Sequence, residues 1–231
     1  SLAVPISSSR SSNSIFISLF LLLPSVAHAQ RKQKVQPTKP DTVAFFRAVA
    51  VGVDVVGPAM KALSSYGQYE ALLRVNLQDK YYPVLEIGVG EANKTDDNTS
   101  TQFKTRAPYG RVGIDFNVLK GKHDAYRVLA GGRVGYTSFK YDVSAPTVTD
   151  PIWGNQVPFG GTGVRSHLLW IEASFGVDAK IWGPIRMGWS LRYKVRAHQK
   201  SNDLGDPWYV PGYGRGGSST LGATFNVLLE L

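Results

Sequence analysis

The 231-residue chain contains no cysteine, so disulfide bonds and cysteine-ligated metal sites are excluded. It has only four histidines, and their positions lack the paired spacing of metal ligands. Its Gly-Gly pairs are not followed by a helical pattern, which a phosphate-binding loop would require. We therefore expect neither a metal site nor a cofactor.

The chain also lacks a long apolar run. After residue 29 there is no stretch of about eighteen apolar residues, the length that a transmembrane helix needs. A shorter apolar core at 15–23 follows Arg10 and precedes an Ala-His-Ala motif that ends just before Gln30. This order predicts a cleaved secretory signal peptide over residues 1–29. If the mature chain is integral to a membrane, it must therefore cross as a β-barrel.

Positive charge is concentrated at the start of the chain. The net charge is +9, from 26 cationic and 17 acidic residues. Five of the cations and none of the acids lie in residues 1–40, so residues 41–231 carry only +4. Residues 30–41 form a basic, proline-containing linker, which we expect to be a solvated spacer. The small remaining excess predicts no nucleic-acid partner.

A two-residue period of apolar and polar side chains runs through the rest of the chain. Its clearest stretch is 185–197, where odd positions such as Trp189 and Leu191 are apolar and even positions such as Arg192 and Lys194 are cationic. Successive side chains on a strand point to opposite faces, so the pattern predicts strands with one apolar and one polar face. The segments that share it are 45–56, 68–77, 85–90, 111–118, 126–137, 169–178, 185–197 and 220–231.

Eight such segments predict an all-β fold, an eight-stranded antiparallel up-and-down transmembrane β-barrel over residues 42–231. Their connections alternate in length, as in outer-membrane barrels, where short turns face the periplasm and longer loops face outward. With the signal peptide, this pattern predicts a location in the outer membrane of a Gram-negative cell, with membrane lipid as a partner. The longer connections are 57–65, 91–105, 139–163 and 199–214, and the shorter ones are 78–80, 119–124 and 180–184.

Alternation alone also fits a soluble lipocalin-like barrel, in which the apolar face is inside. The polar face favours the membrane barrel, because it mixes both signs of charge with many glycines. That mixture suits the narrow, filled interior of an eight-stranded barrel better than a surface in water. We therefore expect the interior to be plugged by charge pairs. The charged residues expected there are Glu70, Arg74, Glu86, Arg111, Asp115, Arg127, Arg133, Glu172, Asp178, Arg186, Arg192, Lys194, Arg196 and Glu230.

Four segments have a distinctive sequence: Tyr-Pro-Val-Leu-Glu-Ile-Gly at 82–88, Ala-Pro-Tyr-Gly-Arg-Val-Gly-Ile-Asp at 107–115, Met-Gly-Trp-Ser-Leu-Arg at 187–192 and Asp-Pro-Trp-Tyr-Val-Pro-Gly-Tyr-Gly at 206–214. Together they resemble a bacteroidete outer-membrane β-barrel family of unassigned function. The last segment is the most specific, and the resemblance covers essentially the whole mature chain. It implies the fold and the membrane location, and it supplies no catalytic residues.

The loops 139–163 and 199–214 each contain an Asp-Pro motif followed by aromatic residues. Both loops are expected outside the cell, and aromatic side chains are common anchors of interfaces. Alternatively, these loops pack on each other and close the barrel mouth. The leading hypothesis is a structural or interaction protein, not an enzyme, which contacts another envelope protein or a glycan. The candidate contact residues are Trp153, Phe159, Trp208, Tyr209 and Tyr213.

Two other functions stay open at the level of sequence. Arginines on the fourth, fifth and seventh expected strands would line a narrow channel or transporter that prefers anions. His198 is expected at the rim near Asp203 and Asp206, so an enzyme acting there on lipid or peptide is the second alternative. His167 and Ser166 are adjacent and hence on opposite faces, which is a poor geometry for a His–Ser relay.

Overall fold

The computed structural model describes most of the chain after residue 43. The expected signal peptide and basic linker lie outside the described residues. The described ranges are 44–97, 99–121, 125–145, 148–149, 156–157, 160–200 and 205–231.

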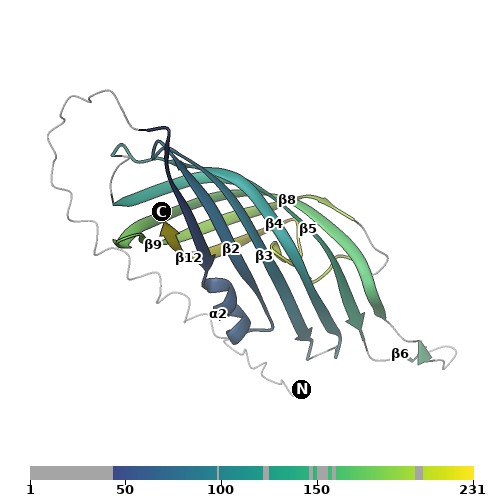
Figure 1. Cartoon of the computed structure of the whole chain (residues 1–231). Coiled ribbons are helices and arrows are strands. Elements are labelled where there is room, and N and C mark those ends of the chain that lie inside the picture. Colours follow the sequence, from purple (N-terminus) through teal and green to yellow (C-terminus); the bar gives the residue numbers. More distant parts are fainter. Residues whose placement is uncertain are drawn as a thin grey trace, which may run out of the picture. The chain divides into compact units, whose positions relative to one another are not determined.

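Eight long strands close into one antiparallel barrel, in the order β1-β12-β9-β8-β5-β4-β3-β2 (Figure 1). Each of these strands pairs with the next one along the chain, and β1 pairs with β12 to close the ring. The expected all-β, eight-stranded, up-and-down barrel is therefore confirmed. The strands are β1 (Phe46–Asp54), β2 (Tyr66–Leu77), β3 (Tyr81–Thr95), β4 (Gln102–Asn117), β5 (Tyr126–Ser144), β8 (Gly160–Trp182), β9 (Ile185–Gln199) and β12 (Ser219–Glu230).

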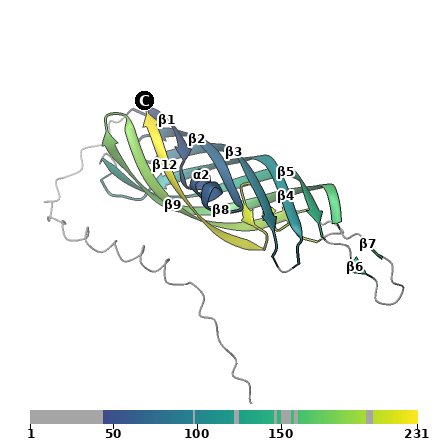
Figure 2. The ribbon, with the colours of Figure 1, turned by 90° about the horizontal axis from the view of Figure 1, so that it is seen from below.

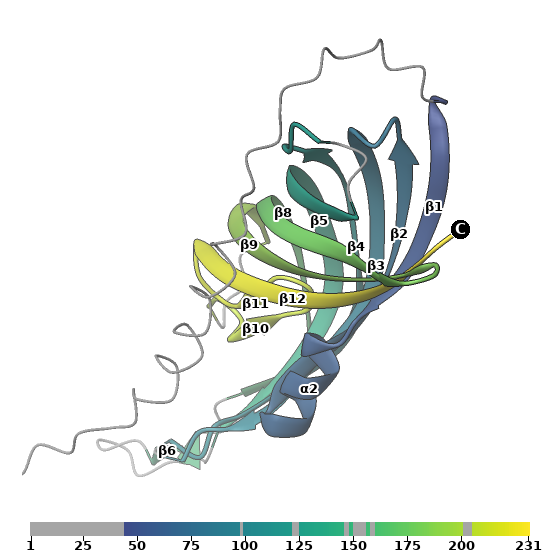
Figure 3. The same ribbon diagram turned by 90° about the vertical axis from the view of Figure 1, so that its left-hand side faces the viewer.

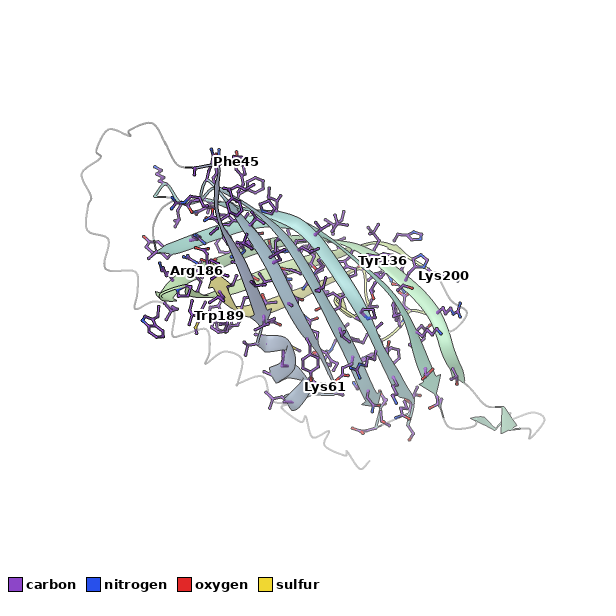
Figure 4. All side chains as sticks on the ribbon, in the orientation of Figure 1. Phe45, Lys61, Tyr136, Arg186, Trp189 and Lys200 are labelled. Atoms are coloured by element: carbon purple, nitrogen blue, oxygen red, sulfur yellow. The ribbon has the colours of Figure 1, made fainter. Side chains whose placement is uncertain are left out.

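The barrel directs polar side chains inward and apolar side chains outward. On β9, Trp189 and Leu191 are 56% and 61% exposed, whereas Arg192 is 1% exposed. Figure 4 shows side chains on both faces of the sheet, from Phe45 at one end of the barrel to Lys200 at the other. A continuous apolar exterior of this kind is unfavourable in water and favourable in lipid. The barrel is therefore a transmembrane barrel, of the class found in bacterial outer membranes.

The apolar belt matches a bilayer in height. The cross-strand partners of Val53 can be followed around the ring in both directions until the two paths meet on β5. Through β2, β3 and β4 the path ends at Tyr136, and through β12, β9 and β8 it ends at Tyr126. Both tyrosines are exposed, and they lie ten residues apart on β5. At ~3.3 Å per residue and a tilt of roughly 40°, this is about 25 Å along the barrel axis. Val53 reaches both tyrosines through equal numbers of strands, so it lies near mid-height.

Four neighbouring strands extend beyond the lipid belt (Figure 2). Residues 91–105 and 139–163 were expected to be loops. The expectation was wrong for much of both, because β3 continues to Thr95, β4 begins at Gln102, β5 continues to Ser144 and β8 begins at Gly160. Outward side chains in this part are charged and exposed, as at Lys104, so the sheet continues into water. Next to it, β6 (Val148–Thr149) and β7 (Gln156–Val157) form a separate two-stranded sheet.

A short helix, α2 (Val56–Leu63), replaces the simple connection expected between the first two strands (Figure 3). Asp54 ends β1 and accepts hydrogen bonds from the first backbone N–H groups of the helix, at Val56 (3.1 Å) and Gly57 (2.9 Å). A Cβ on Gly57 would lie 2.2 Å from the carbonyl oxygen of Gln68, so only glycine lets the helix approach β2 this closely. No helix in the described residues has the length and apolar character needed to span a bilayer.

Candidate functional site

The half of the barrel interior that lies next to the β9–β12 connection is filled by a network of fully buried ion pairs. Its centre is Arg111, which forms ion pairs with Glu70, with Glu86 (Nε to Oε2, 2.9 Å) and with Glu172 (3.1 Å). Trp170 donates its indole N–H to the same Glu172 oxygen at 2.6 Å. These residues come from four different strands, so the network ties opposite walls of the barrel together.

Glu86 is the carboxylate on which most cations converge. Besides its ion pair with Arg111, it accepts hydrogen bonds from Arg192 at 2.8 and 2.9 Å and from Arg133 at 3.1 Å. Arg133 also reaches Asp115 at 2.9 Å. The carboxylates thus compensate the buried guanidinium groups, as burial of charge requires.

A second group of ion pairs fills the interior toward the end of the barrel where the short connections between strands lie. Asp178 binds both Arg74 and Arg186 at 2.6 Å, and Glu230 binds Arg127 at 2.5 Å. The cavity between the two groups has a volume of only about 20 Å³, room for about one water molecule. Of the expected interior charges, all but two are buried. Those two are Glu230, whose side chain is 19% exposed, and Arg196.

The connection between β9 and β12 folds into the mouth of the barrel. It contains a small hairpin of β10 (Tyr209–Val210) and β11 (Gly214–Arg215). Lys194 donates to the carbonyl oxygens of Gly212 (2.7 Å) and Tyr213 (3.1 Å), which anchors the hairpin above the ion pairs. Gly212 has a φ of +79°, and a Cβ there would lie 2.4 Å from the ring of Tyr109. We call residues 205–217 the plug loop.

Tyr209 and Tyr213 were candidates for external contact, and the structure contradicts that role. Each is 2% exposed, because the plug loop turns its rings toward the barrel wall. The Tyr209 hydroxyl donates to the carbonyl oxygen of Gly67 (3.2 Å), and burial raises the pKa of the phenol above its usual range. The alternative was that the two loops pack on each other and close the mouth, and of this the structure shows that the plug loop closes the mouth. Trp153 and Phe159 lie outside the described residues.

Trp208 is the candidate contact residue that lines a cavity at the barrel mouth. This mouth cavity of about 300 Å³ has an aromatic wall of Trp208, Phe103 and Tyr141. Its polar lining comes mainly from the β3–β4 hairpin and from the plug loop. That polar lining consists of Lys94, Asp96, Thr99, Thr101 and Asp206. The two-residue period continues through Phe103, Thr105 and Ala107. This pattern could have predicted a strand where a loop was expected at 91–105.

Arg196 was expected among the interior charges, but it lies at the mouth. Its side chain is 26% exposed and pairs with Asp206 of the plug loop at 2.7 Å. Arg196 shares the inward face of β9 with Arg192 but lies four residues further along, above the carboxylates. Arg196 therefore pairs with the plug loop because of its position along the strand, although its side chain is on the same face as that of Arg192.

The histidine proposed for a rim enzyme has a different environment from the expected one. Asp206 is bound by Arg196 and Gln199, and the ring of His198 stacks on His167 with the centroids 5.6 Å apart. Ser166 is 3% exposed and faces inward, on the side opposite His167. Asp203 lies outside the described residues.

Solved barrels with a similar fold come from several organisms. Neisserial surface protein A is 11% identical, and the match covers 81% of this chain and 98% of that one with a TM-score of 0.41. A major outer membrane protein from Thermus thermophilus is 12% identical (80% and 98% covered, TM-score 0.42), and CarO2 from Acinetobacter baumannii is 13% identical (82% and 100%, 0.42). No curated protein sequence matches significantly. A family match spans residues 12–230, and the chain belongs to the family described as domain of unknown function DUF6048.

Proposed function

We propose that this protein is a non-conducting outer-membrane barrel that serves as a structural and interaction protein, and that its external mouth is the contact surface. The observation that carries the proposal is the double closure of the interior. Paired charges fill the barrel, and the plug loop covers them. The bacteroidete origin suggested by the sequence motifs is part of the proposal.

The chemistry of the mouth cavity supports a sugar-containing ligand or an envelope protein that presents polar groups. Sugars combine apolar C–H faces with hydroxyl groups, and the cavity offers aromatic rings beside carboxylate and hydroxyl groups. The ammonium of Lys94 lies 4.8 Å from the centre of the Trp208 ring, which holds that ring in place. A rigid aromatic side chain loses little entropy on binding and is a favourable contact.

Photocrosslinking in intact cells tests this contact. A photoreactive residue at position 208 is compared with one at Phe175, which is 54% exposed within the lipid belt. We expect position 208 to capture a specific envelope glycan or protein and position 175 to capture lipid. Lipid or nothing at both positions would contradict the role of the mouth.

Planar-bilayer recording tests the closed interior against the alternative of a narrow anion-preferring channel. We expect no conductance steps from the folded protein, because guanidinium groups paired with carboxylates present little net charge to an anion. Reproducible anion-selective steps would replace the proposal with the channel. The rim-enzyme alternative predicts an activity that the His198→Ala variant loses.

A further inference from the structure

The barrel wall is incomplete in its outer half. β1 ends at Asp54, whose partner on β12 is Asn226, so β12 has no β1 partner over residues 219–225. On the other side, the last β2 residue that pairs with β1 is Ala71, opposite Val53. Val53 lies near mid-height of the apolar belt, so this opening faces the outer leaflet of the membrane.

At this opening, backbone N–H and C=O groups of β12 point sideways from its free edge, toward the place where β1 would continue. The N–H of Phe225 bonds to the Asp54 carboxylate (3.1 Å), and its C=O accepts from the N–H of Val55 (2.9 Å). Backbone direction alternates along an antiparallel strand, so Ala223 and Leu221 direct their N–H and C=O groups to the same side. β1 has already ended there. Polar backbone groups facing lipid are costly, so this edge favours a polar occupant.

The helix α2 packs mainly against the β2 side of the opening and touches β12 much less. Gly57 and Gly67 allow close contact between α2 and β2, and a Cβ on Gly67 would lie 2.4 Å from Lys61 Cβ. Between α2 and β12 a cavity of about 310 Å³ remains, which we call the lateral cavity. Its exposed lining includes two apolar residues, Met60 on α2 and Leu221, 78% exposed, on β12, beside Arg215 of the plug loop.

The inner end of the lateral cavity is cationic. Lys194 and Arg192 line it, and both are buried. Arg192 is paired with Glu86, whereas the bonds of the Lys194 ammonium run to two backbone carbonyls of the plug loop. No direct ion pair among the described residues includes Lys194, although Glu172 is its cross-strand neighbour on β8. A Cβ added to Gly222 would lie 3.7 Å from the Lys194 Nζ, so the ammonium lies directly behind the open edge.

We propose that the lateral cavity binds an anionic single-chain amphiphile, a fatty-acyl carboxylate, that enters sideways from the outer leaflet. The carboxylate would supply the direct ion pair that Lys194 does not form among the described residues, and it would accept hydrogen bonds from the open edge of β12. The acyl chain would extend past Met60 and Leu221 into the bilayer. Exposed apolar residues and a buried cation in the same cavity fit a molecule that has both an acyl chain and a negative charge.

Binding of radiolabelled palmitate to the detergent-extracted, folded protein tests the proposal. We expect saturable binding at one site per barrel, with hexadecanol competing at least about tenfold more weakly because it lacks the charge. Acetate, which has the charge but no chain, should also fail to compete at the same concentration. If hexadecanol competes as strongly as unlabelled palmitate, or if binding is not saturable, the proposal is overturned.

Two variants locate the site. Lys194→Met removes the ammonium, and Gly222→Val fills the cavity without changing charge. Each should weaken palmitate binding at least tenfold, while Lys140→Met, the same change at an exposed position, should leave it unchanged. A heat-dependent shift in gel mobility verifies that each variant is folded, and Gly222→Val keeps the test valid if Lys194→Met fails to fold. Normal binding by a folded Gly222→Val, or photocrosslinking from position 223 that yields a polypeptide, would refute the assignment.

Discussion

Glu86 is the residue whose neutralisation should most disturb the barrel interior. Its carboxylate is 1% exposed and accepts hydrogen bonds or ion pairs from Arg111, Arg133 and Arg192 at 2.8–3.1 Å. Glu86→Gln keeps the shape but leaves three buried guanidinium groups short of one negative charge. Removal of one partner from a buried ion pair costs about 3–5 kcal/mol. We expect a loss of stability in that range.

The measurement is equilibrium unfolding in urea of the barrel folded into lipid vesicles, followed by tryptophan fluorescence. Glu91→Gln is the matched control, because it makes the same change on the same strand at a partly exposed carboxylate. Glu91 pairs with Lys61 at 3.2 Å and Arg106 at 3.7 Å, and its side chain is 21% exposed. Such a pair contributes about 0–1 kcal/mol.

A second variant separates charge imbalance from loss of shape. Glu86→Gln combined with Arg192→Met removes one buried cation together with the anion that holds it. We expect this double variant to be more stable than Glu86→Gln alone, because an uncompensated charge costs more than an apolar replacement. If Glu86→Gln loses less than about 1 kcal/mol, as Glu91→Gln is expected to, the interior network does not support the barrel as we describe.

Two further predictions concern the two faces of the wall. Leu191→Arg places a cation in the lipid belt and should cost about 2–4 kcal/mol and lower the yield of inserted protein, whereas Ser138→Arg, outward but above the belt, should insert normally. Equal yields would contradict the facing of β9. Gly135→Ala should cost about 1–3 kcal/mol in urea unfolding, because its Cβ would lie 2.2 Å from the Trp170 ring, whereas Gly110→Ala, with 3.9 Å to the nearest atom, should be neutral. Similar stabilities would show that Trp170 can move aside.

The position of α2 could not be predicted from the sequence around it. Its segment contains Gly57 and Pro58 and lacks a clear helical period, so it resembles an ordinary connection. What makes it a helix is tertiary: Asp54 satisfies its first N–H groups, and β2 offers a surface on which Gly57 fits. The plug loop is similar, because its aromatic residues suit either a surface or a core. Only the barrel mouth above Lys194 buries Tyr209 and Tyr213.

The sequence by itself determined the number of strands, the face that each side chain takes and the match to a membrane. These properties follow from a period of two, which is local and repeats in every strand. The tertiary structure alone decided which charges pair, since Arg74 and Asp178 are 104 residues apart and Arg192 and Glu86 are 106 apart. It also decided where β1 ends and where the wall opens. Both depend on the stagger with which the strands close the barrel, a property that no single strand contains.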